Sequence, residues 1–128
     1  MMMDESATIL GATDASKTIA RSIAWLHKHH LGKGPTKVKC YRHDDCVLVL
    51  MYEGHTHAEE TLQAGGEQKA VARQRVRSSD VIHDQLVEVV ESATERKVVG
   101  YMSSSQQEPS LLSHVFVLEP TDLLTLDA

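Results

Sequence analysis

Apolar residues at helical spacing predict a first helix that begins near Asp14. Its buried face is expected to hold Ile19, Ile23, Leu26 and His30, which recur every three or four positions. Asp14 or Ser16 is expected to cap the helix, because a side-chain oxygen there accepts hydrogen bonds from the first free backbone N–H groups. Gly32 is expected to end it, since glycine readily adopts the left-handed conformation of a helix C-terminus.

A hairpin of two strands is predicted after this helix. Pro35 favours an extended chain, and residues 36–41 then read as a strand. A turn at residues 43–45 leads into residues 46–52, whose centre is continuously aliphatic. Such a run is typical of a strand in the middle of a sheet.

A second strand pair is predicted near the end of the chain, at residues 98–102 and 114–118, joined by a polar loop. The Lys-Val-x-x-Tyr motif occurs in both pairs, at residues 37–41 and again 60 positions later at 97–101. Each copy follows an amphipathic helix and precedes an aliphatic strand. This indicates a helix–strand–strand pseudo-repeat, although valine-rich strands resemble one another by propensity alone.

Between the two pairs the pattern is helical. Thr56 stands three residues before Glu59, which is the spacing of a capping box, and a short helix is expected over residues 57–62. Gly65 and Gly66 interrupt it. A polar, basic helix is predicted over residues 67–77, and an amphipathic helix over residues 80–94. The pattern leaves open whether residues 67–94 form one helix or two that break at residues 78–79.

These elements predict an α+β two-layer sandwich, with a four-stranded, mainly antiparallel sheet of two hairpins and the helices on one face. We expect one domain over residues 13–119, a flexible N-terminal lead-in at residues 1–12 and a C-terminal tail at residues 120–128.

Composition narrows the classes of function. The chain has 13 basic and 18 acidic residues, a formal net charge of −5, and only 4% aromatic residues. A nucleic-acid partner is therefore not expected, because such binding relies on basic surface and base stacking. The longest apolar run, residues 47–52, is far shorter than the roughly 20 residues that cross a bilayer. Residues 1–5 lack the basic start of a signal peptide, so a cytoplasmic location is expected.

The two cysteines are expected to be free thiols in that compartment. A hairpin loop of residues 42–44 would place Cys40 opposite Cys46, so a cross-strand disulfide is the alternative. No zinc-binding or redox spacing is present.

Eight histidines raise the question of a metal site. His55, His57 and Glu59 lie around a helix start, and His27 and His30 share a helix face. Neither group matches a known metal motif, and cationic histidines near a helix C-terminus are favoured by the helix dipole. We predict no metal and no cofactor.

Candidate binding residues are few. In Gly32-Lys33-Gly34-Pro35, two glycines and a lysine are typical of a loop that contacts an anion, although a helix end followed by a strand entry explains the same residues. A basic stripe of Lys69, Arg73 and Arg77, with Arg75 beside it, fits either an anionic partner or a solvated helix face. No arrangement of nucleophile and base is found, so no catalytic residue is predicted.

The succession of these motifs resembles one bacterial family. The residues that carry the resemblance are Gly32-Lys33-Gly34-Pro35 after the first helix, Gly54-x-Thr56-x-Ala58-Glu59 at the next helix start, Arg75, and the strand Val115-Phe116-Val117-Leu118. The family is that of small soluble proteins named component C of a sodium-translocating, membrane-potential-generating system, and the resemblance covers about residues 15–119. His55 and Glu95 depart from its usual pattern.

The resemblance implies an accessory protein of membrane machinery that takes up inorganic carbon or maintains membrane potential, and it implies no catalytic residues. We therefore expect a non-enzymatic, cytoplasmic accessory or regulatory protein, peripheral at the inner membrane face, which binds a membrane protein complex or another protein and forms a homo-oligomer. The alternative is a sensor or enzyme for a small anion or phosphorylated metabolite, in a pocket near Lys33 and Gly34 with Thr56 and Arg75 as further ligand-binding residues.

Overall fold

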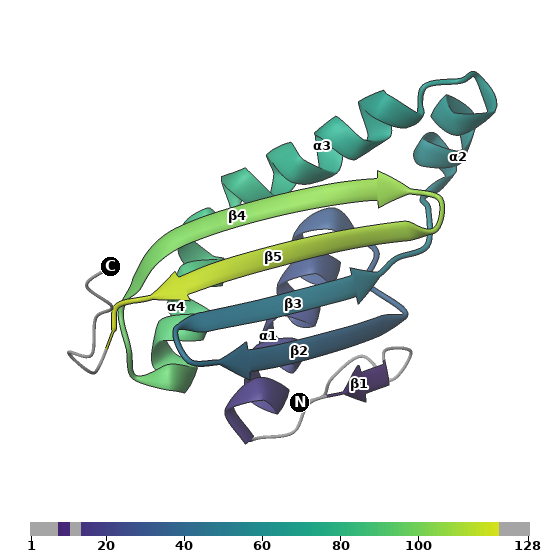
Figure 1. Ribbon diagram of the computed structural model, residues 1–128. Coiled ribbons are helices and arrows are strands. Elements are labelled where there is room, and N and C mark those ends of the chain that lie inside the picture. The colour runs from purple at the N-terminus through teal and green to yellow at the C-terminus, as the bar shows by residue number, and fades with distance from the viewer. Residues whose placement is uncertain (1–7, 11–13, 121–128) are drawn as a thin grey trace.

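Five strands form one sheet in the computed structural model of the protein, which describes residues 8–10 and 14–120 (Figure 1). The strands are β1 (Thr8–Leu10), β2 (Lys37–His43), β3 (Cys46–Tyr52), β4 (Val98–Gln107) and β5 (Ser110–Leu118). Their spatial order is β1-β2-β3-β5-β4. β1 runs parallel to β2, whereas β2, β3, β5 and β4 pair antiparallel in that order.

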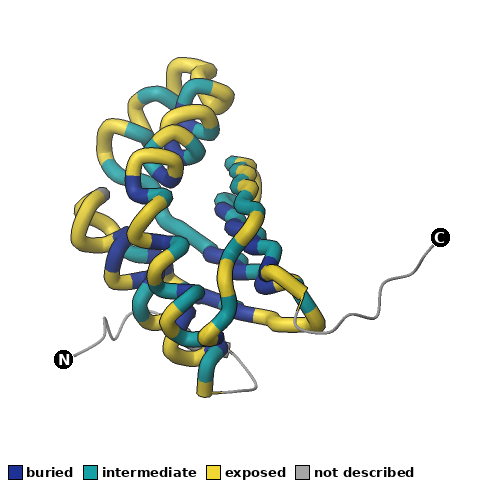
Figure 2. Tube along the Cα trace, turned by 90° about the vertical axis from the view of Figure 1, so that its left-hand side faces the viewer, coloured by how far each residue is buried: buried dark blue, intermediate teal, exposed yellow. Residues whose placement is uncertain are grey.

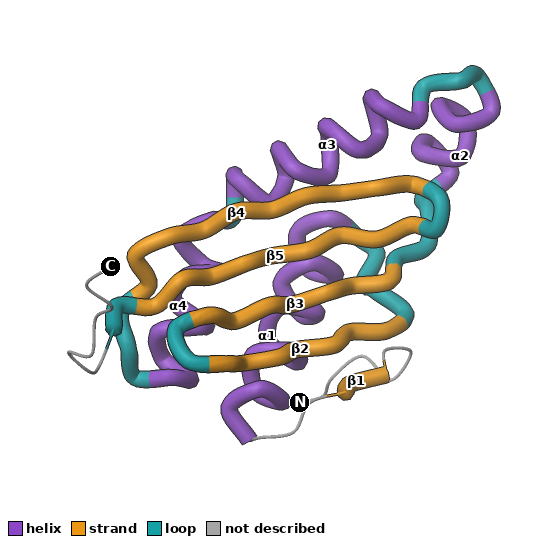
Figure 3. Tube along the Cα trace, in the orientation of Figure 1, coloured by secondary structure: helices purple, strands orange, loops and turns teal. Residues whose placement is uncertain are grey.

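The helices all lie on one face of this sheet, and its other face carries none of the described elements (Figures 2 and 3). They are α1 (Asp14–Leu31), α2 (His57–Ala64), α3 (Gln68–Val81) and α4 (His83–Thr94). The α+β class and the four antiparallel strands expected from the sequence are thereby confirmed. β1 is an additional strand that the sequence pattern does not predict, and it lies within the expected lead-in.

The core lies between the sheet and the helices. Alternate residues of each central strand point towards the helices, so β3 contributes Val47, Val49 and Met51, and β5 contributes Leu112, Phe116 and Leu118. The buried face of α1 differs from the predicted one at its C-terminal end, because His27 is buried there and His30 is exposed. Burying each large aliphatic side chain contributes about 1.5–3 kcal/mol.

The opposite face of the sheet is called the open face from here on. Its residues, in order from β2 to β4, are Lys37, Lys39, Tyr41, His43, Cys46, Leu48, Leu50, Tyr52, Leu111, Ser113, Val115, Val117, Gly100, Met102, Ser104 and Gln106. Half of these sixteen residues are aliphatic side chains or tyrosines, and none is acidic. An antiparallel sheet usually presents polar residues on a face that water covers. The open face therefore differs from an ordinary solvated surface.

The structure corrects the predicted connection between the last two strands. The polar loop expected after residue 102 is wrong, because β4 continues to Gln107 and β5 begins at Ser110. Serines and glutamines are tolerated there because β4 is the last strand of the sheet.

Residues 67–94 form two helices, and the break falls at Ile82, whose φ of −99° and ψ of 19° depart from helical values.

The helix–strand–strand pseudo-repeat is not confirmed. Tyr41 pairs with Leu48 on the open face, whereas Tyr101 pairs with Phe116 on the side of the helices. A β-bulge between Val98 and Gly100 shifts the second strand by one residue, and such a shift moves every following side chain to the other face. The two copies of the motif thus occupy different environments.

Cys40 and Cys46 are both free. The hairpin turn is at Asp44-Asp45, with Asp44 at a φ of 51°, so Cys40 lies opposite Val49 and Cys46 opposite His43. The predicted loop of residues 42–44, which would place the two cysteines opposite each other, is therefore wrong. Cys40 is buried on the helix side, and burial raises the pKa of its thiol to about 11.

The ends of the chain carry two further predictions. Residues 1–7 and 11–12 of the expected lead-in, and residues 121–128 of the expected tail, lie outside the described residues, as does residue 13. The last described residues follow β5 directly, and the backbone N–H of Glu119 donates to the carbonyl oxygen of Lys97 at 2.8 Å. The chain therefore leaves the sheet beside the start of β4.

Candidate functional site

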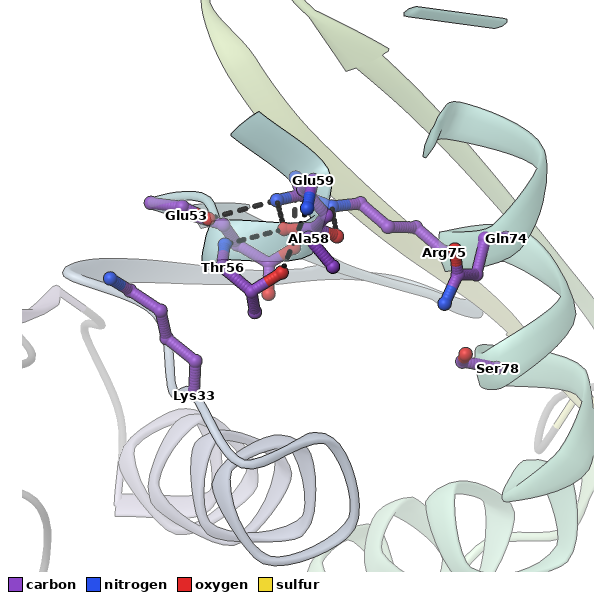
Figure 4. A pocket seen from close by; sticks show the side chains of 9 residues that line it. Lys33, Glu53, Thr56, Ala58, Glu59, Gln74, Arg75 and Ser78 are labelled. Atoms are coloured by element: carbon purple, nitrogen blue, oxygen red, sulfur yellow. Dashed lines mark hydrogen bonds and ion pairs between the residues drawn. The ribbon is translucent and has the colours of Figure 1, made fainter. Parts of the chain in front are cut away.

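A cavity of about 220 Å³ lies where the end of β3 meets α2 and α3 (Figure 4). It is lined by Lys33, Glu53, Gly54, Thr56, Ala58, Glu59, Gln74, Arg75 and Ser78. Lys33, Thr56 and Arg75 come from three separate stretches of sequence, and the fold brings all three to this cavity. Gly34, the remaining predicted ligand-binding residue, is not among the lining residues.

Thr56 is held by the capping box that the sequence predicts. The backbone N–H of Glu59 donates to the Thr56 hydroxyl oxygen at 3.1 Å, and the backbone N–H of Thr56 donates to the Glu59 carboxylate at 2.9 Å. The Thr56 side chain therefore serves the start of α2. The capping box also fixes Glu59, whose carboxylate turns towards α3.

Thr56→Ala is expected to lower the free energy of unfolding by about 1 kcal/mol, because an N–H at the helix start loses its acceptor. Urea denaturation measures the change. Thr61→Ala is the matched control, since Thr61 lies inside α2 and its hydroxyl donates only to the His57 carbonyl oxygen. Its expected effect is within about 0.5 kcal/mol. Equal losses in the two variants would contradict the capping role.

Arg75 is almost completely buried, and its guanidinium is enclosed by acceptors. It donates to both carboxylate oxygens of Glu59, at 3.0 and 3.1 Å, to the carbonyl oxygen of Gly54 at 2.8 Å and to the hydroxyl of Ser110 at 2.6 Å. A second carboxylate, that of Glu53, lies 3.4 Å from Nη1. Bidentate pairing of this kind suits the planar guanidinium, and a hydrogen bond between charged groups is stronger than one between neutral groups.

The two carboxylates differ in their protonation. Burial raises the pKa of Glu53 to about 7, because the attraction of Arg75 offsets only part of the desolvation and Glu59 adds repulsion. Burial also acts to raise the pKa of Glu59, but its hydrogen bonds from Arg75 and Thr56 outweigh that effect and lower the pKa. Glu59 is thus the permanent partner of Arg75, whereas Glu53 exchanges a proton near neutral pH.

Glu53 also connects the cavity to a row of polar groups inside the core. The row, called the polar chain below, consists of Tyr101, His114, His27, Glu53, Arg75 and Glu59. The Tyr101 hydroxyl lies 2.8 Å from His114 Nδ1, the Nε2 atoms of His114 and His27 are 3.0 Å apart, and His27 Nδ1 faces the Glu53 carboxylate at 3.7 Å. The polar chain crosses from β4 and β5 through α1 to α3 and α2.

Both histidines of the polar chain are fully buried and neutral. Burial lowers the pKa of His27 to about 4, with help from the charges of Arg75 and His30. Burial likewise lowers the pKa of His114 to about 3, and the neighbouring His27 adds to the effect. The Nε2–Nε2 contact requires one ring to donate and the other to accept, so the two tautomers are coupled. When His114 accepts from Tyr101 and donates to His27, the Nδ1–H of His27 points at Glu53.

This arrangement limits what the cavity can do with an anion. The Arg75 guanidinium is neutralised by Glu59 and faces Glu53, so it does not stand free for a ligand. Lys33 is the remaining cation of the lining, and its ammonium donates only to the His55 carbonyl oxygen at 3.5 Å. An anion in the cavity would therefore rely on Lys33 and would face two carboxylates.

The histidines considered as metal ligands have other contacts. His55 Nε2 lies 3.0 Å from both Gln107 Oε1 and Gln63 Nε2, so it donates to the first or accepts from the second according to its tautomer, and His57 is exposed beside Glu60. Within residues 8–10 and 14–120, no three His, Cys, Asp or Glu side chains are grouped so that they would hold a metal ion.

A band of apolar side chains crosses the open face from one strand to the next. Tyr41, Leu48, Val115 and Met102 lie in register on β2, β3, β5 and β4. The two ends of the band are strongly exposed, Tyr41 at 53% and Met102 at 58% of their full surface. Lys37 and Lys39 flank it, with their ammonium groups 4.5 and 5.5 Å from the centre of the Tyr52 ring. This is an apolar surface with a positive border.

Residue type and spacing in the sequence indicate Thr56, Arg75 and Lys33, but they do not indicate the contacts that join the polar chain. His114 alternates with Leu112 and Phe116 on a buried strand face, and His27 follows Ile23 by one helical turn, so the burial of both was available from periodicity. Nothing in the pattern indicates that the two rings meet. Glu53 directly follows a strand and carries no signal of its role.

Comparisons with known proteins point to one family. The family described as "Na+-translocating membrane potential-generating system (MpsC)" matches residues 13–120. No significant match is found among curated proteins or among solved structures. None of the helices in the described part of the chain is long and apolar enough to cross a membrane.

Proposed function

Because the chain belongs to the MpsC family, named for a Na+-translocating membrane potential-generating system, we propose that it is a non-enzymatic accessory subunit that docks on a membrane protein of that system. The observation that carries this proposal is the open face, an apolar sheet surface that no described element covers. We place the protein in the cytoplasm, at the inner membrane face. The machinery it serves takes up inorganic carbon or maintains membrane potential.

The partner is proposed to be a different protein, with apolar side chains at the centre of its contact and carboxylates at the edge. The apolar band supplies the centre, because exposed contiguous apolar surface typically marks a protein interface. Lys37 and Lys39 supply the charge that complements the carboxylates. A second copy of the chain offers no carboxylate from its own open face. The homo-oligomer expected from the sequence is thus a separate proposal, through another surface, and sedimentation of the purified protein measures it.

Met102→Glu is expected to weaken binding to the membrane partner at least about tenfold, because it places a charge in a desolvated contact. The measurement is co-purification with the membrane subunits of the same system after co-expression, quantified against the bait. Val81→Glu is the matched control, since Val81 is 82% exposed at the end of α3, away from the open face. Equal recovery of the partner by the two variants would contradict the proposal.

A second candidate function rests on the meeting of Lys33, Thr56 and Arg75 at one cavity. Under this alternative, the protein is a sensor or enzyme for a small anion or phosphorylated metabolite. The pairing of Arg75 with Glu59 argues against this function, whereas the position of Lys33 at the cavity supports it.

Thermal unfolding separates this second candidate from the first. Phosphorylated metabolites and bicarbonate are added to the wild-type protein and to Lys33→Ala. A ligand of the cavity is expected to raise Tm in the wild type only, because binding to the folded state stabilises it by mass action. Lys17→Ala, at an exposed lysine of α1, controls for loss of a surface lysine. No rise with any anion, or the same rise in Lys33→Ala, would exclude the cavity as an anion site.

A further inference from the structure

The outer edge of β4 and the helix above it form a second surface, whose groove shares only Ser104 with the open face. β4 is the last strand of the sheet, and none of the described strands pairs with its outer side. Every second residue of this ten-residue strand thus directs its backbone N–H and C=O groups to an unpaired edge. Such an edge is a template for another extended chain unless the protein blocks it. β4 contains no proline or lysine, which often block such an edge, and its β-bulge lies at one end, between Val98 and Gly100.

α3 extends over the place that a further strand would occupy. In Figure 1 the helix lies beyond β4, past the last strand, and Figure 2 shows it on the helix side of the sheet. A groove of about 350 Å³ runs between the two elements. It is lined by Ala72, Arg73, Val76 and Arg77 of α3 and by Ser103, Ser104 and Ser105 of β4. This volume falls within the roughly 300–1,000 Å³ typical of binding sites.

The charge of the groove indicates what it would bind. Arg73 and Arg77 lie one helical turn apart on α3, and both are exposed. Neither forms an ion pair or a hydrogen bond with any described residue, in contrast to Arg75 on the same helix. Ala72 and Val76 provide an apolar strip beside them. An extended segment whose carboxylates meet the arginines and whose apolar side chains meet this strip fits both features.

A second copy of β4 does not fit this groove. Antiparallel pairing of two β4 edges would bring the α3 helices of both copies to the same side of the joined sheet. Arg73 and Arg77 of one copy would then approach those of the other, and like charges at an interface are destabilising.

We propose that the β4 edge and the α3 groove bind an extended, acidic segment of a partner protein, which adds to the sheet as a strand beside β4. The backbone of the segment pairs with the free edge of β4, and its side chains alternate between the groove and the open side. This surface differs from the open face, so the proposal holds independently of the docking proposed above.

The test uses a fluorescein-labelled decapeptide with blocked ends, in which every second residue is in turn glutamate or valine and the residues between them are threonine, so that one side of the strand presents both glutamate and valine to the groove. Fluorescence anisotropy at low salt measures its binding to the full chain, and amide hydrogen exchange measures protection along β4. Binding is expected to fall at least tenfold in Arg73→Glu/Arg77→Glu and to be unchanged in Arg21→Glu, which alters an exposed arginine of α1. Those amides of residues 103–105 that point away from β5 are expected to gain protection when the peptide binds.

Three outcomes would overturn the proposal. One is equal binding of a peptide with lysine in place of glutamate, or of one with a central proline, which cannot pair as a strand. Another is binding without added protection in β4, since a charge contact alone produces that result. The third concerns residues 121–128, which contain two aspartates and three leucines. If removing them increases peptide binding tenfold, the occupant is this chain's own segment and not a partner.

Discussion

Replacing Arg75 by alanine is expected to lower the free energy of unfolding by about 3–5 kcal/mol. The substitution leaves the carboxylates of Glu59 and Glu53 buried without their cation, and it removes donors from the Gly54 carbonyl oxygen and the Ser110 hydroxyl. Removing one partner of a buried ion pair lowers stability by more than the intact pair contributes, because the remaining charge stays desolvated. Urea denaturation at pH 7.5 measures the loss.

Arg73→Ala is the matched control, since Arg73 is exposed on the same helix and makes no ion pair with a described residue. Its expected effect is within about 0.5 kcal/mol. If Arg75→Ala does not fold, Arg75→Lys keeps the charge while losing the bidentate geometry, and an intermediate loss is expected. A loss below about 1 kcal/mol for Arg75→Ala would contradict the structural role of the polar chain.

Acidification is expected to destabilise the protein by about 3 kcal/mol between pH 6.5 and pH 4. The pKa values of His27 and His114 are about 4 and about 3 in the folded state, below the ordinary 6.5. The unfolded chain therefore binds two more protons than the folded protein on these groups as the pH falls below 6.5. The free energy of unfolding therefore decreases progressively as the pH falls from 6.5 through the folded-state pKa values.

Glu53 acts in the opposite direction. Its pKa of about 7 in the folded state lies above the ordinary 4.5, so its contribution to stability is fully present below pH 4.5 and is lost as the pH rises through 7. Between pH 6.5 and 4.5 the folded state binds about one proton more than the unfolded chain on Glu53 and about two fewer on the histidines. The free energy of unfolding therefore falls by about 1.4 kcal/mol for each unit of decreasing pH, and near pH 7 the two effects cancel.

Urea denaturation across this pH range tests the balance. Glu53→Gln removes the compensating group, so its stability is expected to fall more steeply than that of the wild type between pH 6.5 and 4.5. His43→Gln is the control, because His43 is exposed at the end of β2. A wild-type stability that is flat over this range, or a shallower slope in Glu53→Gln, would contradict neutral burial of the histidine pair.

The fold was largely predictable because its elements are marked by local signals. Aliphatic runs, the Thr56–Glu59 capping box and the glycines between helices each act over a few residues, and the structure has them where the sequence analysis placed them. β1 escaped prediction because three residues are too short to show a period. The length of β4 escaped it because serines and glutamines are poor strand indicators, although an edge strand tolerates them.

The candidate site was predictable only in part, for a related reason. Lys33, Thr56 and Arg75 stand out by residue type, and the fold brings them to one cavity. The contact between His27 and His114 joins residues 87 positions apart, and it depends on how α1 packs on β5. The docking surface is likewise a property of the whole molecule. Alternation shows that one face of each strand is apolar, but only the assembled helices show which face stays uncovered.

Site-specific photocrosslinking in native membranes tests the open face most directly. A benzophenone side chain replaces Tyr41 or Met102, at the two ends of the apolar band, and Val81 serves as the exposed control on α3. Docking through the open face predicts that both band positions capture the same membrane protein and that position 81 does not. Capture at the level of position 81, or capture only of another copy of this chain, would contradict it.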